Sequence, residues 1–88
     1  MNPLTDLEYR MLDELYFVSS FQNVLDNLIE ERSHVIDALK NLLENNLVTQ
    51  VKMESGREEK LEVPDFAILE ESYFVASKKG LLLHNSRN

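Results

Sequence analysis

The chain has no cysteine, only two glycines and two prolines, and no long apolar run. Without cysteine, neither disulfide bonds nor thiolate metal sites can form. The scarcity of glycine and proline favours a regular backbone, because these residues commonly interrupt helices and strands. No apolar segment approaches the length of a membrane span, and the first residues do not have the pattern of a signal peptide. We therefore expect a cytoplasmic protein that has no membrane partner.

Positive charge is also scarce, since nine Lys and Arg stand against sixteen Asp and Glu, giving a net charge of −7. Residues 31–46 carry a net charge of −1, and residues 47–64 carry the same. Among the segments, only residues 78–88 are positive, at +3. Proteins are drawn to duplex DNA largely through its phosphates. Charge alone therefore attracts only this last segment to DNA.

Motifs for catalysis or for bound cofactors are missing as well. The only histidines, His34 and His84, lack the H-E-x-x-H spacing of a zinc site. The serines have no histidine and acid arranged as a catalytic triad, and the chain has no glycine-rich phosphate loop. Adjacent glutamates such as Glu58 and Glu59 point apart on a regular element. We expect no enzyme activity, no metal site and no cofactor.

With 88 residues, 43% of them hydrophobic, the chain is expected to form one domain over residues 1–88. Thr5-Asp6-Leu7-Glu8 has the form of a capping box, so a first helix is predicted at about 5–18. Ser19 and Gln22 form a second such pattern, which predicts a helix at about 20–30. A third helix is predicted at about 32–45, because apolar residues at 35, 36, 39, 42 and 43 share one helix face.

The second half of the chain has the pattern of a small sheet. Asn46 is expected to close the third helix in the left-handed conformation. The β-branched run 47–51 predicts a strand, and Glu54-Ser55-Gly56-Arg57 predicts a hairpin tip. Two more strands are predicted at 60–63 and 73–76. The wing sheet therefore covers about 47–77, and a terminal turn follows at 78–84.

One alternative remains open between residues 20 and 45. This stretch has neither Gly nor Pro, and apolar residues at 21, 25, 28, 35, 39 and 42 also fit a single heptad seam. A single long helix would give a helical hairpin or a coiled-coil partner. Two helices are favoured, because the polar cluster at 30–34 interrupts the seam.

Two local patterns resemble those of winged helix-turn-helix transcriptional regulators of the broad MarR/PadR/ArsR-like kind. The first is S-x-V-x-x-x-L-x-x-L-x-x-x-x-L-V, which begins at Ser33 and ends at Val48. The second is an aromatic strand followed by Ser-x-Lys-Gly, which spans Tyr73 to Gly80. The resemblance covers about residues 5–84. It implies an α+β fold with three helices, a two- or three-stranded β wing and a short C-terminal helical turn.

The resemblance also implies a DNA-binding surface. Family members read DNA from the exposed N-terminal half of the third helix and from the wing. The matching residues here are Arg32, Ser33, His34, Asn41, Lys52, Arg57 and Lys60. Asp37 on this helix and the glutamates that flank Arg57 depart from that pattern, since phosphates repel carboxylates.

A second class of function is therefore carried forward, an acidic winged-helix protein-interaction module that does not bind DNA by itself. Its candidate contact residues are Phe66, Ile68 and Leu69, an apolar segment between acidic flanks. The possible partners are duplex DNA, another protein, or a second copy of the chain in a homodimer.

Overall fold

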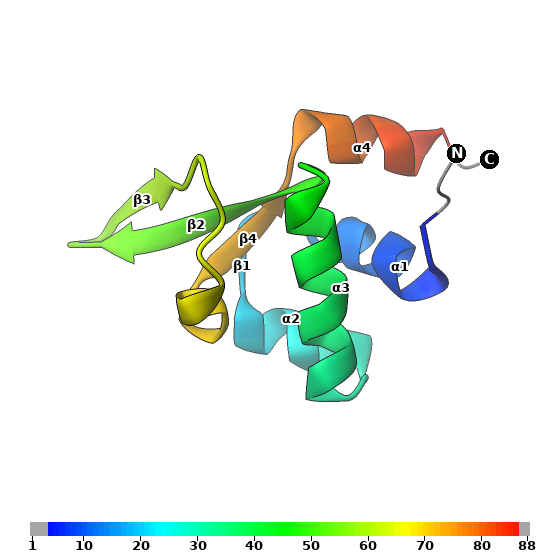
Figure 1. The fold of residues 1–88 in the computed structure, drawn as a ribbon, viewed down its shortest axis with the longest axis horizontal. Helices are drawn as coiled ribbons and strands as arrows, with labels where there is room; N and C mark the ends of the chain where they lie inside the picture. Colours follow the sequence, from blue (N-terminus) through cyan, green and yellow to red (C-terminus); the bar gives the residue numbers. More distant parts are fainter. Residues whose placement is uncertain (1–3, 87–88) are drawn as a thin grey trace.

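The computed structural model describes residues 4–86, in which helices and strands combine in an α+β arrangement. The helices are α1 (Asp6–Glu14), α2 (Phe21–Leu28), α3 (Arg32–Glu44) and α4 (Lys78–Asn85), and η1 (Phe66–Glu71) is a short 3-10 helix. The strands are β1 (Ser19–Ser20), β2 (Val48–Glu54), β3 (Arg57–Lys60) and β4 (Tyr73–Ala76). They form one antiparallel sheet of four strands in the order β1-β4-β2-β3 (Figure 1).

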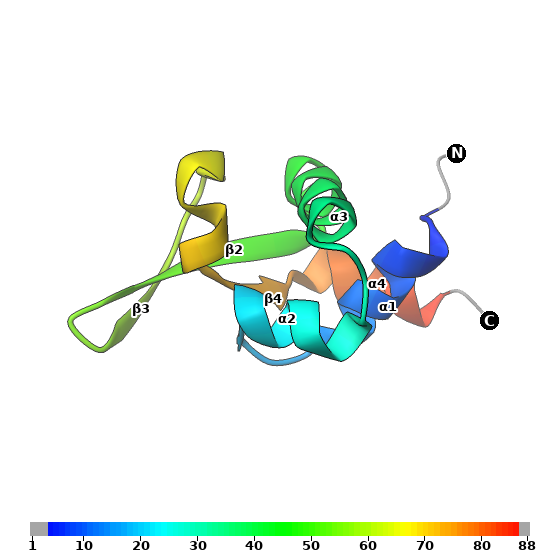
Figure 2. The ribbon, with the colours of Figure 1, turned by 90° about the horizontal axis from the view of Figure 1, so that it is seen from below.

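The β2–β3 hairpin projects away from the body, whereas the helices gather around the other end of the sheet (Figure 1). Seen from the second direction, η1 and α3 lie on the same side of β2 (Figure 2). The core lies where the helices meet β2 and β4. Apolar side chains fill it, drawn from α1, α2, α3, β2, η1, β4 and adjoining loop residues: Met11, Leu12, Leu15, Phe21, Val24, Leu28, Val35, Ala38, Leu39, Leu42, Leu43, Leu47, Val48, Leu69, Phe74 and Ala76.

The first helix is shorter than its apolar pattern predicts. The predicted capping box is present, since the Glu8 amide donates to Thr5 Oγ1 at 3.1 Å and the Thr5 amide donates to Glu8 Oε1 at 2.9 Å. The helix ends at Glu14 instead of at about residue 18. The Leu15 carbonyl accepts a bond from the Ala76 amide at 2.8 Å, so the chain leaves the helix to run beside β4.

The cap of α2 is also one residue away from its predicted position. Ser20, not Ser19, accepts the Asn23 amide at 3.1 Å, because α2 begins at Phe21, directly after the two residues of β1 that pair with β4. Between α2 and α3 the helix is interrupted. Ile29 adopts the left-handed conformation with φ 53°, and α3 begins only at Arg32. The alternative of one long helix over 20–45 is therefore wrong.

The end of α3 and the tip of the hairpin follow their predicted chemistry. Asn46 has φ 61°, and the Leu47 amide returns to the Leu42 carbonyl at 2.9 Å, as in a Schellman closure. Ser55 and Gly56 both have positive φ, which gives the hairpin the twist that its strands need. The strand predicted at 60–63 is misplaced, because this tight turn starts β3 at Arg57, opposite Glu54, and the β2–β3 pairing extends only to Lys60, opposite Val51.

Two segments have a secondary structure that differs from the one predicted from the sequence. Residues 66–71 form η1 instead of part of a continuous wing sheet. The terminal turn predicted at 78–84 is the helix α4, which Ser77 caps by accepting the Gly80 amide at 3.0 Å. A Cβ at Gly80 would lie 2.0 Å from the Leu47 carbonyl oxygen. This close approach requires glycine and lets α4 pack against the start of β2.

Candidate interaction surface

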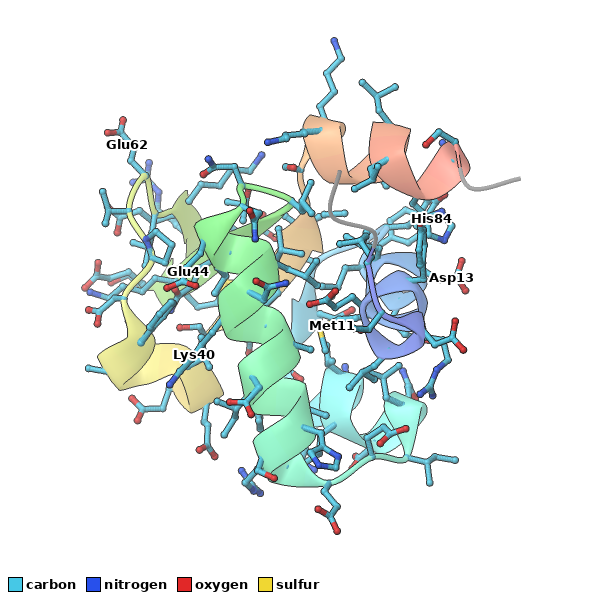
Figure 3. All side chains as sticks on the ribbon, turned by 45° about the vertical axis from the view of Figure 1, so that its right-hand side comes forward. Met11, Asp13, Lys40, Glu44, Glu62 and His84 are labelled. Carbon is cyan, nitrogen blue, oxygen red and sulfur yellow. The ribbon has the colours of Figure 1, made fainter. Side chains whose placement is uncertain are left out.

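The solvent face of α3 carries Ser33, His34 and Asp37, all of them exposed. One flank of the helix faces η1, and Lys40 and Glu44 project on that side (Figure 3). The face thus presents hydroxyl, imidazole and carboxylate groups, with a single lysine at its flank. A surface of this composition offers little attraction to a phosphate backbone.

Arg32, the first residue of α3, forms an ion pair with Glu70 of η1. Its guanidinium also lies over the Phe21 ring, 5.5 Å from the ring centroid. The two charged side chains are about half exposed, at 52% for Arg32 and 47% for Glu70. The arginine predicted to meet DNA is therefore occupied by a carboxylate of the same chain.

His34 and Asn41 also contact carboxylates. The His34 ring nitrogens lie 3.9 Å from Glu30 Oε1 and 3.9 Å from Glu31 Oε1. Arg10 hydrogen-bonds Glu30 and holds the pKa of that carboxyl below its usual range, with a smaller contribution from His34. Asn41 donates to Oε2 of the buried Glu8 at 2.5 Å. One N–H of the Asn41 side-chain amide is therefore used to join α3 to α1.

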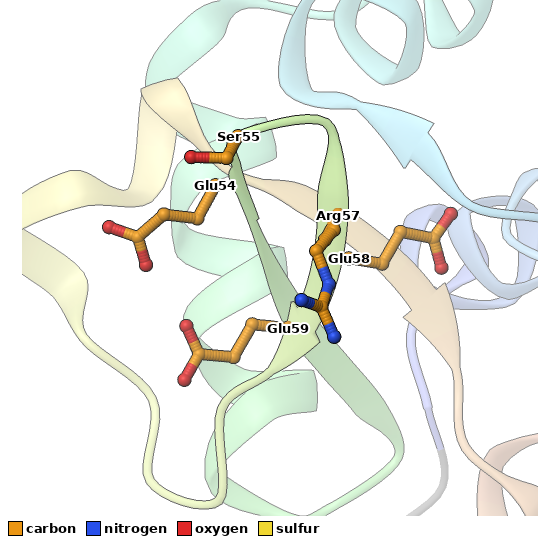
Figure 4. A pocket seen from close by; sticks show the side chains of 5 residues that line it. All are labelled: Glu54, Ser55, Arg57, Glu58 and Glu59. Carbon is orange, nitrogen blue, oxygen red and sulfur yellow. The ribbon is translucent and has the colours of Figure 1, made fainter.

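The cations of the hairpin face acids across the ladder. Arg57 pairs with Glu54 and Lys52 pairs with Glu59, and Lys52 Nζ lies 3.7 Å from Glu54 Oε2. Cross-strand partners share one face of a sheet, so these opposite charges attract each other. Figure 4 shows Arg57 in a hollow with carboxylates around it, Glu58 directed away from Glu54 and Glu59. Lys60 lies opposite Val51, at the end of the ladder.

The apolar segment 66–69 divides between surface and core. Phe66 is 36% exposed, and Lys40 Nζ lies over its ring at 5.4 Å from the centroid. Ile68 is partly buried, and Leu69, only 3% exposed, belongs to the core. The prediction that Leu69 contacts a partner is therefore wrong, because a partner cannot reach a side chain that packs inside the fold. Phe66 and Ile68 remain accessible.

Gln50 determines where η1 lies, and the sequence prediction missed it. This residue of β2 is 1% exposed, and its amide nitrogen donates to the Asp65 carbonyl at 2.9 Å and to Ser72 Oγ at 2.8 Å. Its amide oxygen accepts the Asp65 backbone amide at 2.9 Å. Both ends of η1 are thus tied to one buried side chain. A glutamine within a strand of mixed polarity carries no local signal of this role.

The expectation of a chain without a metal site concerns the histidines and the acids. Among residues 4–86, no group of three or more His, Asp or Glu side chains lies where it would hold a metal ion. His84 of α4 instead joins α4 to α1, with its Nδ1 3.1 Å from the Tyr16 hydroxyl and its Nε2 3.6 Å from Asp13 (Figure 3). Arg87, part of the positive tail, lies outside the described residues.

Comparison with known proteins gives no relative from which to transfer a role. No family model, no curated protein and no solved structure matches the chain. Within the part of the chain that the structure describes, no helix combines the length and the apolar character needed to cross a membrane.

Proposed function

We propose that the chain is a winged helix-turn-helix domain that works as an acidic protein-interaction module and does not bind duplex DNA by itself. The order of elements supports the winged-helix assignment. Two helices, α2 and α3, precede the β2–β3 hairpin, and β1 completes the sheet beside β4. In this assignment α3 is the helix that would read DNA and the hairpin is the wing.

The observation that carries the function is the pairing of cations within the chain. Arg32 forms an ion pair with Glu70, Lys52 lies near Glu54, and Arg57 has Glu54 as its register partner in the ladder, without a close ion pair among the contacts of the described residues. Binding to DNA gains free energy when a cation replaces the counterions of a phosphate. A cation that must first leave a carboxylate gains less, and the released carboxylate is then repelled by the phosphates.

The same charges suit a basic protein partner. The net charge of −7 attracts a positively charged surface over a distance of about a Debye length and speeds the encounter. The flank where α3 meets η1 adds an apolar contact, because the Phe66 ring is partly exposed there beside Lys40. Partly exposed aromatic rings are common anchors in protein interfaces.

Autonomous DNA binding is the second candidate, and one observation favours it. Ser33 and His34 are exposed on the N-terminal half of α3, and the Arg32–Glu70 pair beside them is about half exposed. Exposed ion pairs contribute only about 0–1 kcal/mol to stability. A phosphate could therefore replace Glu70 as the partner of Arg32 at a small cost.

Fluorescence anisotropy with a labelled duplex at low salt separates the two candidates. We expect no binding by the wild-type domain. Binding that weakens linearly in log salt, and that Arg32→Ala and Arg57→Ala each reduce, would instead establish the DNA-binding function. Glu70→Gln frees Arg32 and Glu71→Gln is its matched control, so phosphate contact by Arg32 predicts tighter binding for Glu70→Gln than for Glu71→Gln.

The protein-binding function is tested with a synthetic amphipathic peptide of Lys and Leu, followed by NMR shifts of the backbone amides. We expect shifts to gather on α3 and η1, and Phe66→Ala to weaken binding. A peptide with the same apolar face and Glu in place of Lys should not bind. Shifts spread evenly over the acidic surface, unaffected by Phe66→Ala, would contradict a defined docking surface.

A further inference from the structure

Ile29, in the turn between α2 and α3, conflicts with two physical preferences at once. Its backbone lies in the left-handed region with φ 53° and ψ 53°. A β-branched side chain disfavours that region, which glycine and asparagine adopt more readily. Its side chain is also 87% exposed, the highest value among the large hydrophobic residues that the structure describes.

Neither conflict is relieved by packing. Ile29 does not belong to the core, and its backbone amide makes the ordinary helix-closing bond to the Leu25 carbonyl at 3.3 Å. Asparagine could make the same bond in the same conformation with less strain. A residue that breaks local preferences without a gain inside the fold points to a contact outside it.

The surroundings of Ile29 are acidic. Of the charged residues within three positions of it along the chain, Asp26, Glu30 and Glu31 are acidic, and the one base, Arg32, forms an ion pair with Glu70. Arg10 compensates for one of these charges, since its guanidinium lies 2.7 Å from Glu30 Oε2. The exposed isoleucine thus projects from a surface that retains a net negative charge.

At the opposite end of α3 the molecule has an apolar pocket with basic residues beside it. Leu4, Leu47 and Leu83 line a pocket of about 150 Å³, together with Asn45 and Lys79. Lys79 donates to the Asn45 carbonyl at 3.2 Å, and the exposed Lys78 precedes it. Figure 1 shows the two ends of α3 well apart, with the α2–α3 turn below and α4 above.

We propose that Ile29 of one copy of the chain inserts into the Leu4–Leu47–Leu83 pocket of a second copy. Charge complementarity supports this occupant, because acids surround the isoleucine and lysines adjoin the pocket. The two contacting surfaces differ, so the contact is heterologous. Each copy that is added leaves one Ile29 side chain and one pocket unoccupied at the ends of the assembly. A contact of this small size gives weak, open-ended association instead of a stable closed dimer. The inference does not depend on which macromolecule the domain binds.

The test is the mass of the protein by sedimentation equilibrium from about 0.01 to about 1 mM, a range in which weak contacts associate. We expect the weight-average mass of the wild type to rise with concentration without levelling at a dimer. Ile29→Asn should lower the association constant about tenfold or more, since it removes the apolar side chain. It should also fold at least as stably as the wild type, because asparagine suits the left-handed backbone.

Two further variants make the result specific. Val63→Asn removes another exposed apolar side chain, 76% exposed, and should associate like the wild type. Glu31→Lys and Lys79→Glu should each weaken association, and the two changes together should restore it. A wild type that stays monomeric at about 1 mM, a mass that levels at a dimer, or an Ile29→Asn protein that associates equally would each overturn the proposal.

Discussion

Gln50→Leu should destabilise the fold strongly, because the glutamine amide is buried and holds both ends of η1. The substitution keeps the side chain roughly as large but removes the bonds to the Asp65 carbonyl, the Asp65 amide and Ser72 Oγ. Ser72 Oγ retains one partner, since it also bonds the Ile68 carbonyl at 2.6 Å. The two backbone groups of Asp65 lose the partners that the glutamine supplied.

The magnitude follows from these bonds. A buried polar group left without a partner costs about 1–3 kcal/mol, and Asp65 lies near enough to solvent to recover part of that loss from water. We therefore expect a loss of about 2–4 kcal/mol for the three bonds together. For a domain of this size, each kcal/mol lowers the melting temperature by about 4–8 °C.

Urea denaturation of the variant measures the loss, and amide hydrogen exchange locates it. Gln22→Leu is the matched control, because Gln22 is exposed on α2 and its amide bonds only the neighbouring Asp26 at 2.8 Å. The control should change stability by less than about 0.5 kcal/mol. If Gln50→Leu costs less than about 1 kcal/mol and the Asp65 amide keeps its protection, Gln50 does not hold η1.

Three other substitutions test single contacts. Gly80→Ala should cost about 1–3 kcal/mol or more in a thermal melt, since the new Cβ would meet the Leu47 carbonyl oxygen at 2.0 Å; a wild-type melting temperature would refute this close approach. Thr5→Ala should cost about 1 kcal/mol in urea, because it removes the cap of α1, and Thr49→Ala at a site that caps no helix is the comparison. Arg10 lowers the pKa of Glu30, so its carboxylate stabilises the fold above the usual glutamate pKa of about 4.3, and this contribution is lost as the pH falls below that value. Glu30→Gln should therefore reduce the acid sensitivity of the urea midpoint, and an unchanged pH profile would contradict the ion pair.

Those features of the fold that depend on neighbouring residues could be predicted from the sequence. The capping box of Thr5 and Glu8, the closure of α3 at Asn46 and the turn at Ser55 and Gly56 each depend on chemistry within a few residues. The helix break near residue 30 followed from a polar cluster that interrupts an apolar face. Such signals are contained in any short window of the chain.

Features that depend on distant partners could not be predicted in this way. The apolar spacing through Val18 continues past Glu14, and only the bond between Leu15 and Ala76 shows why α1 ends. The cap lies at Ser20 instead of Ser19 for a similar reason, because both serines pair with β4 and α2 begins only after them, at Phe21. Tertiary contacts here override a local pattern that is equally compatible with a longer helix.

The candidate site is the part that was least predictable from the sequence, because the partners of its polar and charged side chains lie far away along the chain. Arg32 and Glu70 are 38 residues apart in sequence, and Asn41 and Glu8 are 33 residues apart. The composition gives the net negative charge, but it does not show which Lys and Arg side chains lie beside an acidic side chain. The position of η1, which brings Glu70 to Arg32 and Phe66 to Lys40, depends on a buried amide in β2 that no motif marks.

This dependence couples stability to function in a way that differs between the two proposed functions. Releasing η1 by Gln50→Leu would separate Glu70 from Arg32 and expose one cation at the start of α3.

If the domain binds DNA, the Gln50→Leu variant should therefore bind duplex DNA more tightly than the wild type, although it unfolds at a lower urea concentration. If the domain binds a basic protein segment through α3 and η1, the same variant should lose both stability and peptide binding, because Phe66 would leave its place beside Lys40. Measuring urea midpoint, duplex binding and Lys-Leu peptide binding on this one variant separates the functions by the sign of the binding change. A variant that loses stability but leaves both binding reactions unchanged would mean that η1 contributes to neither surface.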